Sequence, residues 1–495
     1  MWGRGEKFAG QLSADPSLAL LTDLYQVTMA FGYWKLGRAD DESVFHLFFR
    51  RAPFRGGYAI AAGLAQALAY LQGLRFSGED VAYLAGLTGN DGRPLFEDGF
   101  LRYLEALRFT CEVDGIEEGT AVFAHEPLLR LRGPILQCQL VETPLLNIMN
   151  FATLIASKAA RVCDAAGGAP VLEFGLRRGQ GIDGALSAAR AAYIGGCAAT
   201  SNVLAGKRYG IPVKGTHAHS WVMSFADERE AFAAYARAMP NNCVFLVDTY
   251  DTLEGVKRAI EVGKELRAQG HELAGVRLDS GDLNVLSQAA RSLLDEAGFN
   301  NAAIVASNDL DEYEITALRA AGARISVWGV GTRLVTAYDQ PALGGVYKLA
   351  AVRSGPDAAW DYRIKLSEEI IKVSNPGIQQ VRRLRGADGK FRGDVIYEET
   401  LGVTDVAHRV DAAGTFACGV ADGSAEDLLV PVMRGGATVY AVPPLSASQA
   451  RTREQLAALP DGVRRLQGAE VYPVGLDRKL FELRATVMAA ARAAR

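Results

Sequence analysis

The middle of the chain alternates between short apolar runs and longer amphipathic stretches. Between about residues 170 and 330, runs of β-branched and apolar residues recur, and stretches with helical spacing, such as 251–270, separate them. This alternation is typical of parallel β/α architecture and fits a barrel or a doubly wound sheet. The predicted strands are 170–176, 211–216, 242–249, 273–279, 302–308 and 324–330.

Unusual polar residues gather directly after these predicted strands, where parallel β/α folds carry their chemistry. Each loop by itself is compatible with turn or helix-capping chemistry. Together they predict a site for a phosphorylated sugar, with cations and backbone N–H groups for phosphates and carboxylates for hydroxyls or Mg²⁺. The loops contain Arg177 and Arg178, then HAHS (217–220), DTYD (248–251), RLDSGD (277–282), SNDLDE (307–312) and GVGTR (329–333).

Composition narrows the class of protein. A chain of 495 residues with 49% apolar residues is long and apolar enough for two or three folded domains. A formal charge of -4 gives no overall attraction to nucleic acid or to anionic membranes. We expect a soluble protein, because neither a signal-peptide core nor a membrane-spanning run is evident. The six cysteines lack disulfide or metal spacing, which favours reduced thiols and the cytoplasm.

The segment GTHAHSW (215–221) contains His217 and His219, separated by one alanine. Such a pair after a strand is known from zinc-dependent hydrolases, from structural pairs and from nucleophilic catalysis. Only His271 and His408 follow, and His271 lies on the entry side of its predicted strand, so the zinc ligand count is not met. The residues alone leave the structural and catalytic alternatives open.

Taken in order, seven segments resemble the nicotinate phosphoribosyltransferase family. The likeness runs through most of the chain and is weakest after about residue 385. The resemblance implies an irregular, TIM-like α/β barrel over 131–350. It also implies a mixed α/β domain over 1–130, which segments of 351–495 partly rejoin, with a small subdomain as the alternative. The matching segments are LLTDLYQVTMA (20–30), EFGLRRGQG (173–181), GTHAHSWVMSF (215–225), VRLDSGDL (276–283), SNDLDE (307–312), WGVGTRLVTA (328–337) and LGGVYKLA (343–350).

The resemblance also implies a reaction. Nicotinate and 5-phosphoribosyl 1-pyrophosphate would give nicotinate mononucleotide and pyrophosphate in NAD synthesis, with ATP hydrolysis and with Mg²⁺ on the polyphosphates. His219 matches the catalytic histidine that ATP phosphorylates in the family, and Asp248 is expected to hold its other nitrogen. His217 is expected to be structural. The protein would be a homodimer with shared active sites that acts on small molecules.

The same resemblance distributes the substrate groups. Arg277 and Phe174 would bind the nicotinate ring, Ser220 would favour an acid over an amide, and Gly331 would let the backbone approach the phosphate. Alternatives are a nicotinamide or quinolinate phosphoribosyltransferase and a catalytically silent nucleotide sensor. The expected nicotinate residues are Tyr25, Phe174, Arg177, Ser220 and Arg277, the ribose and phosphate residues are Asp279, Asn308, Asp309, Gly331, Thr332 and Lys348, and looser candidates for pyrophosphate or ATP are Arg51, Lys365 and Lys372.

Overall fold

A computed structural model describes residues 18–367, 369, 372–410, 414–418 and 423–493. The expectation of no signal-peptide core bears on residues 1–17, which lie outside the described residues. The chain forms two compact units. Unit 1 combines the chain up to Leu154 with the chain from Ala342 onward, and unit 2 is Ile155–Pro341. The change of unit therefore falls inside one long helix, α6 (Glu142–Ala165).

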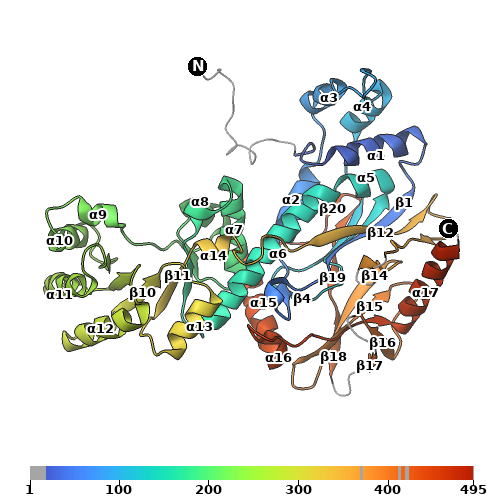
Figure 1. Cartoon of the computed structure of the whole chain (residues 1–495). Coiled ribbons are helices and arrows are strands. Elements are labelled where there is room, and N and C mark those ends of the chain that lie inside the picture. The colour runs from blue at the N-terminus through green and yellow to red at the C-terminus, as the bar shows by residue number, and fades with distance from the viewer. Residues whose placement is uncertain (1–17, 368, 370–371, 411–413, 419–422, 494–495) are drawn as a thin grey trace. The chain divides into compact units, whose positions relative to one another are not determined.

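Unit 2 is an α/β unit built on a parallel sheet. Its six strands are paired in the order β7, β6, β11, β10, β9, β8, and every pair is parallel. Figure 1 shows α11, α12 and α13 lying along these strands. The strands are β6 (Val171–Glu173), β7 (Ala199–Thr200), β8 (Val244–Leu246), β9 (Gly275–Leu278), β10 (Ala303–Ser307) and β11 (Val327–Val330). The helices are η3 (Leu176–Arg178), α7 (Ile182–Ile194), α8 (Val203–Tyr209), α9 (His219–Met223), α10 (Glu228–Ala238), α11 (Thr252–Ala268), α12 (Leu283–Glu296), α13 (Glu312–Ala320) and α14 (Thr332–Val335).

Five of the six predicted strands are present, and 211–216 differs. This segment makes a single bridge, Thr200 to Val213, and β7 stands where no strand was expected. Pro212 has no N–H to donate, so the segment offers only a broken ladder. Across residues 155–341, all of which are described, β7 and β8 are consequently the ends of the sheet. The closed barrel expected from the resemblance is not seen as a continuous ring of paired strands.

The strand sequences explain their position inside the unit. In β10, four of the five residues are buried, and the run is apolar rather than alternating. Such runs are typical of parallel strands that are covered on both faces. The helix that follows begins at Asp311, whose side chain accepts hydrogen bonds from the backbone N–H groups of Tyr313 and Glu314. A buried strand therefore passes directly into a capped helix, with a short polar loop between them.

Unit 1 is built on two larger sheets and a two-stranded one. The first has the order β13, β12, β1, β5, β3, β19, β20, and the second has the order β17, β16, β21, β15, β14, β18. Late segments thus pair with early ones, since β12 and β5 flank β1 in antiparallel register. The helix α17 (Arg478–Ala493) lies against β15, β16 and β21 (Figure 1).

The strands of unit 1 are β1 (Glu42–Phe49), β2 (Ala59–Ile60), β3 (Glu112–Ile116), β4 (Ala121–Val122), β5 (Leu129–Pro134), β12 (Gly345–Arg353), β13 (Asp361–Tyr362), β14 (Gln379–Arg385), β15 (Phe391–Glu398), β16 (Val406–Arg409), β17 (Thr415–Ala417), β18 (Ser424–Asp427), β19 (Leu429–Arg434), β20 (Ala437–Thr438) and β21 (Val474–Asp477). Its other helices are α1 (Leu24–Lys35), η2 (Pro53–Arg55), α2 (Leu64–Gly73), α3 (Gly78–Ala85), α4 (Asp98–Ala106), α5 (Ile135–Leu140), α15 (Leu445–Ala458), α16 (Asp461–Arg464) and α17 (Arg478–Ala493).

Candidate active site

Three consecutive strand ends of unit 2 repeat one arrangement of polar residues. Each loop contains a pair of polar residues three positions apart, and the first of each pair is Asp248, Asp279 or Asn308. The second caps the helix that follows by accepting backbone N–H groups: Asp251 caps α11, Asp282 caps α12 and Asp311 caps α13. Helix capping thus accounts for the second polar residue in each loop and leaves the first one for other chemistry.

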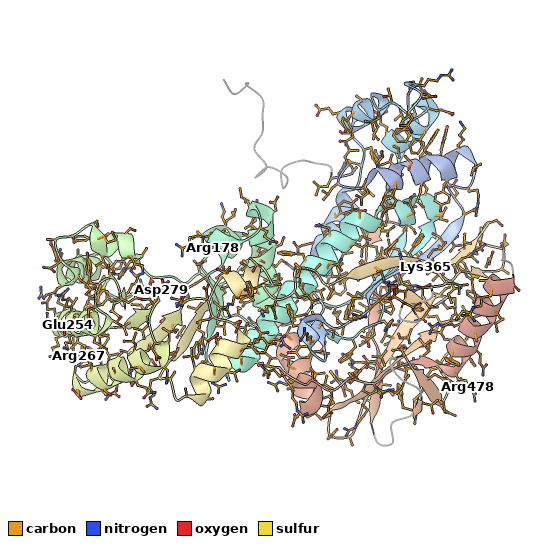
Figure 2. All side chains as sticks on the ribbon, viewed as in Figure 1. Arg178, Glu254, Arg267, Asp279, Lys365 and Arg478 are labelled. Carbon is orange, nitrogen blue, oxygen red and sulfur yellow. The ribbon has the colours of Figure 1, made fainter. Side chains whose placement is uncertain are left out.

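Arg277 and Asp279 form the centre of the candidate site, at the carboxyl end of β9. The guanidinium group donates from Nε to Ser307 Oγ at 2.7 Å, from Nη1 to Thr216 Oγ1 at 3.0 Å and from Nη2 to Asp279 Oδ1 at 2.8 Å. The Ser307 hydroxyl also donates to Asp279. Hydroxyls from two neighbouring loops therefore fix the direction of one cation and one carboxylate. Figure 2 shows Asp279 at the sheet, whereas Glu254 and Arg267 lie on the outer helix α11.

The Asp279 carboxylate is kept ionised by this surrounding. Burial raises its pKa, but the hydrogen bond from Ser307 and the positive charge of Arg277 outweigh burial, so the pKa lies below the ordinary value. An ionised carboxylate accepts hydrogen bonds with both oxygens. Asp279 is therefore suited to hold two adjacent hydroxyl groups.

His219 lies at the start of α9 with its two ring nitrogens in different surroundings. Nδ1 is 3.1 Å from Thr249 Oγ1. Nε2 faces two carboxylates, at 3.7 Å from Asp279 Oδ2 and 3.9 Å from Asp248 Oδ1. The ring is 41% exposed, so it can meet a ligand. The two carboxylates favour the tautomer with its proton on Nε2, in which the Nδ1 lone pair faces the Thr249 hydroxyl.

Asp248 holds the next loop as well as facing the histidine. Its Oδ2 accepts the backbone N–H of Asp279 at 2.9 Å and the hydroxyl of Ser280 at 2.6 Å. Its Oδ1 is buried and has no hydrogen-bond partner. The expected contact with His219 is thus a distance of 3.9 Å between Asp248 Oδ1 and His219 Nε2. This is longer than a hydrogen bond, so the two groups would have to move closer to form one.

His217 has a structural environment. Its ring is buried among Phe232, Tyr235 and Phe245, and its Nε2 accepts the backbone N–H of Leu246 at 3.3 Å. Burial lowers its pKa to about 4, which leaves the ring neutral. The Nε2 atom of His217 is thus used in a hydrogen bond to the backbone, and the geometry does not place His217 and His219 as two ligands of one metal ion.

Phe174 and Arg177 follow β6. In the sheet, β11 lies between β6 and β10. The Arg277 guanidinium carbon lies 5.7 Å from the centre of the Phe174 ring, within the range of a cation–π contact. A Cβ on Gly329 would come within 2.8 Å of this ring, so glycine is needed there for the ring to lie on β11. Arg177 is exposed on η3, and Ser220 is exposed on α9. A flat ring face and a cation are thus brought together.

The expected phosphate residues lie on two neighbouring loops. Asn308 has φ 137°, a strained value for a residue with a side chain, and such strain persists where surrounding structure holds it. Gly331 and Thr332 follow β11. Arg333 Nη1 donates to Asp311 Oδ2 at 2.6 Å and joins the two loops. Asp309 is exposed beside Asn308.

Tyr25 and Lys348 belong to unit 1, and their expected roles stay predictions. Tyr25 is 48% exposed near the start of α1. Lys348 lies on β12, where burial and the nearby charges of Arg50 and Lys365 lower its pKa. The looser candidates Arg51, Lys365 and Lys372 are in the same unit. Unit 1 therefore carries a basic cluster of its own.

Four hydroxyl residues of the site were not singled out from the sequence: Thr216, Thr249, Ser280 and Ser307. Each directly follows or ends a predicted strand, so position was the available signal. Within the described residues, no group of three or more His, Cys, Asp and Glu side chains is placed to hold a metal ion. A search of the same residues for a helix long and apolar enough to cross a membrane gives none.

Comparison with known proteins agrees along the whole length. Three family models match: the nicotinate phosphoribosyltransferase N-terminal domain at 20–150, the nicotinate phosphoribosyltransferase family at 170–355 and the C-terminal domain at 378–484. The C-terminal match extends the likeness well beyond residue 385, where the sequence resemblance was weakest.

Full-length relatives are similar as well. The chain is 45% identical to nicotinate phosphoribosyltransferase of Bacillus subtilis (strain 168) over 94% of each chain. It is 37% identical to the human protein of that name, over 94% of this chain and 95% of the relative. The crystal structure of human nicotinic acid phosphoribosyltransferase superposes with a TM-score of 0.81 at 33% identity, over 94% of this chain and 99% of that one. The chain belongs to the nicotinate phosphoribosyltransferase family.

Proposed function

We propose that this protein is a nicotinate phosphoribosyltransferase, which converts nicotinate and 5-phosphoribosyl 1-pyrophosphate to nicotinate mononucleotide and pyrophosphate. One observation carries the proposal: Arg277, Asp279 and Phe174 converge at the strand ends with His219 beside them. Arg277 and Phe174 would bind the carboxylate and the ring of nicotinate, and Asp279 would bind ribose. His219 would be the nucleophile that reacts with ATP.

Nicotinate would lie against Phe174, with its carboxylate toward arginine. Arg277 uses three donors within the protein, and a guanidinium group has five, so two remain for the substrate. Arg177 adds a second, exposed cation. Ser220 carries no charge that would repel the carboxylate. The site thereby prefers the acid to the amide.

Phosphoribosyl pyrophosphate would be held from the adjacent loops. Asp279 accepts the ribose hydroxyls, and the backbone around Asn308, Asp309, Gly331 and Thr332 receives the 5′-phosphate. Lys348 on unit 1 is assigned to the phosphates, with Arg51, Lys365 and Lys372 as candidates for pyrophosphate or ATP. This division gives each anionic group of the substrate its own cation or backbone donors.

The transfer needs little proton movement. The lone pair of the pyridine nitrogen forms the bond to C1 of ribose, while the bond from C1 to the pyrophosphate oxygen breaks and its electrons leave with pyrophosphate. The ring nitrogen has no proton to lose, so no general base is required. Asp279 holds the sugar and its negative charge stabilises the positive charge that develops at C1.

His219 would couple this reaction to ATP. Nδ1 attacks the γ-phosphorus, the bond to the β-phosphate oxygen breaks and ADP leaves. The Nε2 proton stays on the ring, opposite Asp248 and Asp279, whose charges stabilise the cationic phosphohistidine ring. Water later cleaves the P–N bond and releases phosphate. Phosphorylation is proposed to tighten substrate binding.

Mg²⁺ is assigned to the polyphosphates rather than to a protein cage. Mg²⁺ is commonly bound through one or two carboxylates together with the phosphates of a substrate. Bound there, it would neutralise charge on the leaving pyrophosphate. Asp279 and the phosphate loops would then orient the sugar.

Assembly and location form part of the proposal. Leu21, Leu24, Tyr25 and Met29 are all more than 40% exposed around the start of α1, and such an apolar patch favours association. We assign it to a homodimer in which Tyr25 reaches the partner's nicotinate site.

All six cysteines are free, which is consistent with the cytoplasm. The bridge at Val213 supports a barrel-like curvature of the unit 2 sheet.

The test measures nicotinate mononucleotide and pyrophosphate from nicotinate and phosphoribosyl pyrophosphate, with and without ATP. Wild type is expected to respond to ATP, His219→Ala to lose that response, and His271→Ala to retain it, because His271 bonds only to Asn241 at an exposed position. Equal stimulation in all three would remove His219 from the mechanism. Product from nicotinamide or quinolinate instead of nicotinate would overturn the substrate.

A further inference from the structure

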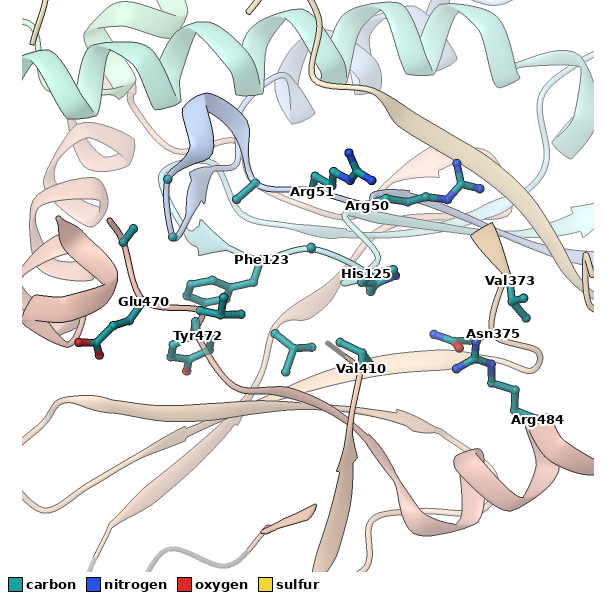
Figure 3. Close-up of a pocket in the computed structure, with 17 residues that line it drawn as sticks. Arg50, Arg51, Phe123, His125, Val373, Asn375, Val410, Glu470, Tyr472 and Arg484 are labelled. Atoms are coloured by element: carbon teal, nitrogen blue, oxygen red, sulfur yellow. The ribbon is translucent and has the colours of Figure 1, made fainter. Parts of the chain in front are cut away.

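Unit 1 contains a pocket that the proposed reaction does not use as such. Its volume is about 500 Å³, and all residues that line it belong to unit 1. Figure 3 shows it between the segment of Arg50 and Arg51, the loop of Phe123 and His125, and the helix α17. Pockets of ~300–1,000 Å³ are typical of organic ligands, whereas inorganic phosphate would fill only a small part of this one.

The charged residues of the pocket are mainly cations. Arg50, Arg51 and Arg484 line it together with one carboxylate, Glu470. Glu470 lies at the opposite end of the pocket from Arg484 (Figure 3) and pairs with Arg465 at 3.3 Å. The end that holds Arg484 therefore has an excess of positive charge, which favours a ligand with two negative charges.

Arg484 is the cation that most needs a partner. Arg484 is half-buried, its Nε is buried without a hydrogen bond, and among the described residues no carboxylate forms an ion pair with it. Burial lowers its pKa accordingly. Partial withdrawal of a guanidinium group from water without an acceptor is unfavourable, and an acidic ligand group in the pocket would offset it.

The remainder of the lining is largely apolar. Val373, Val410 and Val474 contribute side chains, and the stacked rings of Phe123 and Tyr472, whose centroids are 3.7 Å apart, close one side. Asn375 lies at the same end as Arg484 and offers an amide (Figure 3). The pocket thus joins a cationic end to an apolar body.

We propose that this pocket binds an organic phosphate monoester, with its phosphate at Arg484 and its apolar part against Val410, Val474 and the Phe123–Tyr472 pair. Planar guanidinium groups match phosphate oxygens geometrically, and Arg50 and Arg51 supply further charge. Arg484 has no part in binding nicotinate, phosphoribosyl pyrophosphate or ATP as assigned above. Arg51, a candidate for pyrophosphate or ATP, is shared with the proposed reaction, so the test is made at Arg484.

Isothermal titration of the full-length protein with phenyl phosphate tests the site, without nucleotides or substrates present. Arg484→Gln is expected to weaken binding about tenfold, since it removes a charge-assisted contact. The matched control is Arg478→Gln, which removes the same charge from an exposed position of α17 outside the pocket (Figure 2). Other phosphate-binding sites contribute equally to all three proteins, so the difference isolates the pocket.

Titrations with inorganic phosphate and with benzyl alcohol serve as controls, because the first carries only the phosphate group and the second only the aromatic part of the ligand. Each is expected to bind at least about tenfold more weakly than phenyl phosphate, because each engages only one end of the pocket. Equal binding of phenyl phosphate to wild type and Arg484→Gln, or none at millimolar concentration, overturns the proposal. If inorganic phosphate binds as tightly as phenyl phosphate, the proposal that the pocket recognises an organic phosphate is wrong.

Thermal unfolding without ligand separates binding from folding. Because Arg484 is half-buried and its Nε has no hydrogen-bond partner among the described residues, Arg484→Gln is expected to leave the Tm unchanged or raise it. Phenyl phosphate is expected to raise the Tm of wild type and of Arg478→Gln more than that of Arg484→Gln. A lower Tm for Arg484→Gln in the absence of ligand would mean that the residue supports the fold, which contradicts the proposal.

Discussion

At the scale of single residues, the candidate site consists of side chains that hold one another's charges in place. Arg277 directs three donors into protein groups, and Asp279 accepts one of these bonds and a further one from Ser307. Groups fixed in this way need little reorganisation when substrate binds. Single substitutions here should therefore affect selectivity and catalysis more than stability.

Ser220 offers a direct test of selectivity. Ser220→Asp places a carboxylate beside the proposed position of the nicotinate carboxylate, and two like charges ~4 Å apart at a protein surface repel by several kcal/mol before screening. We expect kcat/KM for nicotinate to fall about tenfold or more and the ratio of nicotinamide to nicotinate to rise. Steady-state kinetics with both substrates measure this.

Ser220→Asn is the matched control, because it has nearly the same volume as aspartate and no charge. It should retain most of the preference for nicotinate. If Ser220→Asn and Ser220→Asp lose nicotinate activity equally, size rather than charge explains the loss, and the electrostatic account of selectivity is wrong.

His217 predicts a pH dependence of stability. Its pKa is lowered from 6.5 to about 4 in the fold, so the unfolded chain binds more protons between those values. The contribution is therefore fully present above pH 6.5 and is lost as pH falls toward 4. Its full size is about 3 to 4 kcal/mol, from roughly 1.4 kcal/mol per pKa unit. Calorimetric Tm values between pH 7 and 5 should show part of this loss.

His217→Gln keeps an acceptor for the Leu246 N–H group and does not titrate. Its Tm should fall less than that of wild type over the same pH range. The comparison cancels other groups, including Glu228, whose pKa burial raises to about 7. His271→Gln, which lies outside the site and whose ring contacts Asn241 at the surface, should follow wild type. Identical curves for His217→Gln and wild type would contradict the assignment.

At the scale of elements, each strand of unit 2 passes its chemistry and its helix cap through one short loop. The spacing of three residues between Asp279 and Asp282 places the first on the strand end and the second at the N-cap of α12. A carboxylate at an N-cap satisfies backbone N–H groups of the first turn, whereas a carboxylate at the strand end points into the site. Similar residues therefore have separable roles.

The pair Asp279→Asn and Asp282→Ala tests this separation. Asp282→Ala should cost about 1 kcal/mol of stability by loss of the cap, and leave kcat/KM nearly unchanged. Asp279→Asn should lower kcat/KM about a hundredfold with a smaller change in Tm, because a charge near C1 and a ribose acceptor are lost. Thermal unfolding and steady-state kinetics on both variants check it. A reversed pattern would exchange the two roles.

At the scale of the whole molecule, the chain forms two compact units. Unit 2 contains an internal ion cluster, in which Lys158 Nζ lies 2.7 Å from Glu312 Oε2, without the angle of a hydrogen bond, and 2.7 Å from Asp339. Arg161 donates to the other oxygen of Glu312 at 2.9 Å. Glu312 is the first residue of α13, so this cluster fixes the helix that follows the phosphate loop.

Lys158→Met should destabilise unit 2 selectively. Removing one partner of a buried ion pair leaves charge uncompensated and costs ~3–5 kcal/mol. Hydrogen exchange resolves the units: slow amides in β10 and β11 should exchange faster, and those in β14 and β15 should not change. Lys264→Met, which removes an exposed lysine of α11, should leave both sets unchanged. Equal acceleration in both units would mean that they unfold together.

The sequence by itself determined the family, the series of buried parallel strands and the position of the polar loops. Family membership is confirmed, and five predicted strands form, because an apolar run followed by a capping residue is a local signal. The failure at 211–216 is also instructive, since the apolar pattern there predicts a buried strand, whereas residues 212–215 are exposed and the segment makes a single bridge beside Pro212, which has no N–H to donate.

Only the tertiary structure decided which polar residues meet. Ser307 bonds to both Arg277 and Asp279 from a neighbouring loop, Thr249 rather than Asp248 contacts His219 Nδ1, and Arg484 lines a pocket with the distant Arg50. The reason is physical: a residue's place along a strand follows from local periodicity, whereas its partners depend on how strands far apart in sequence are laid side by side.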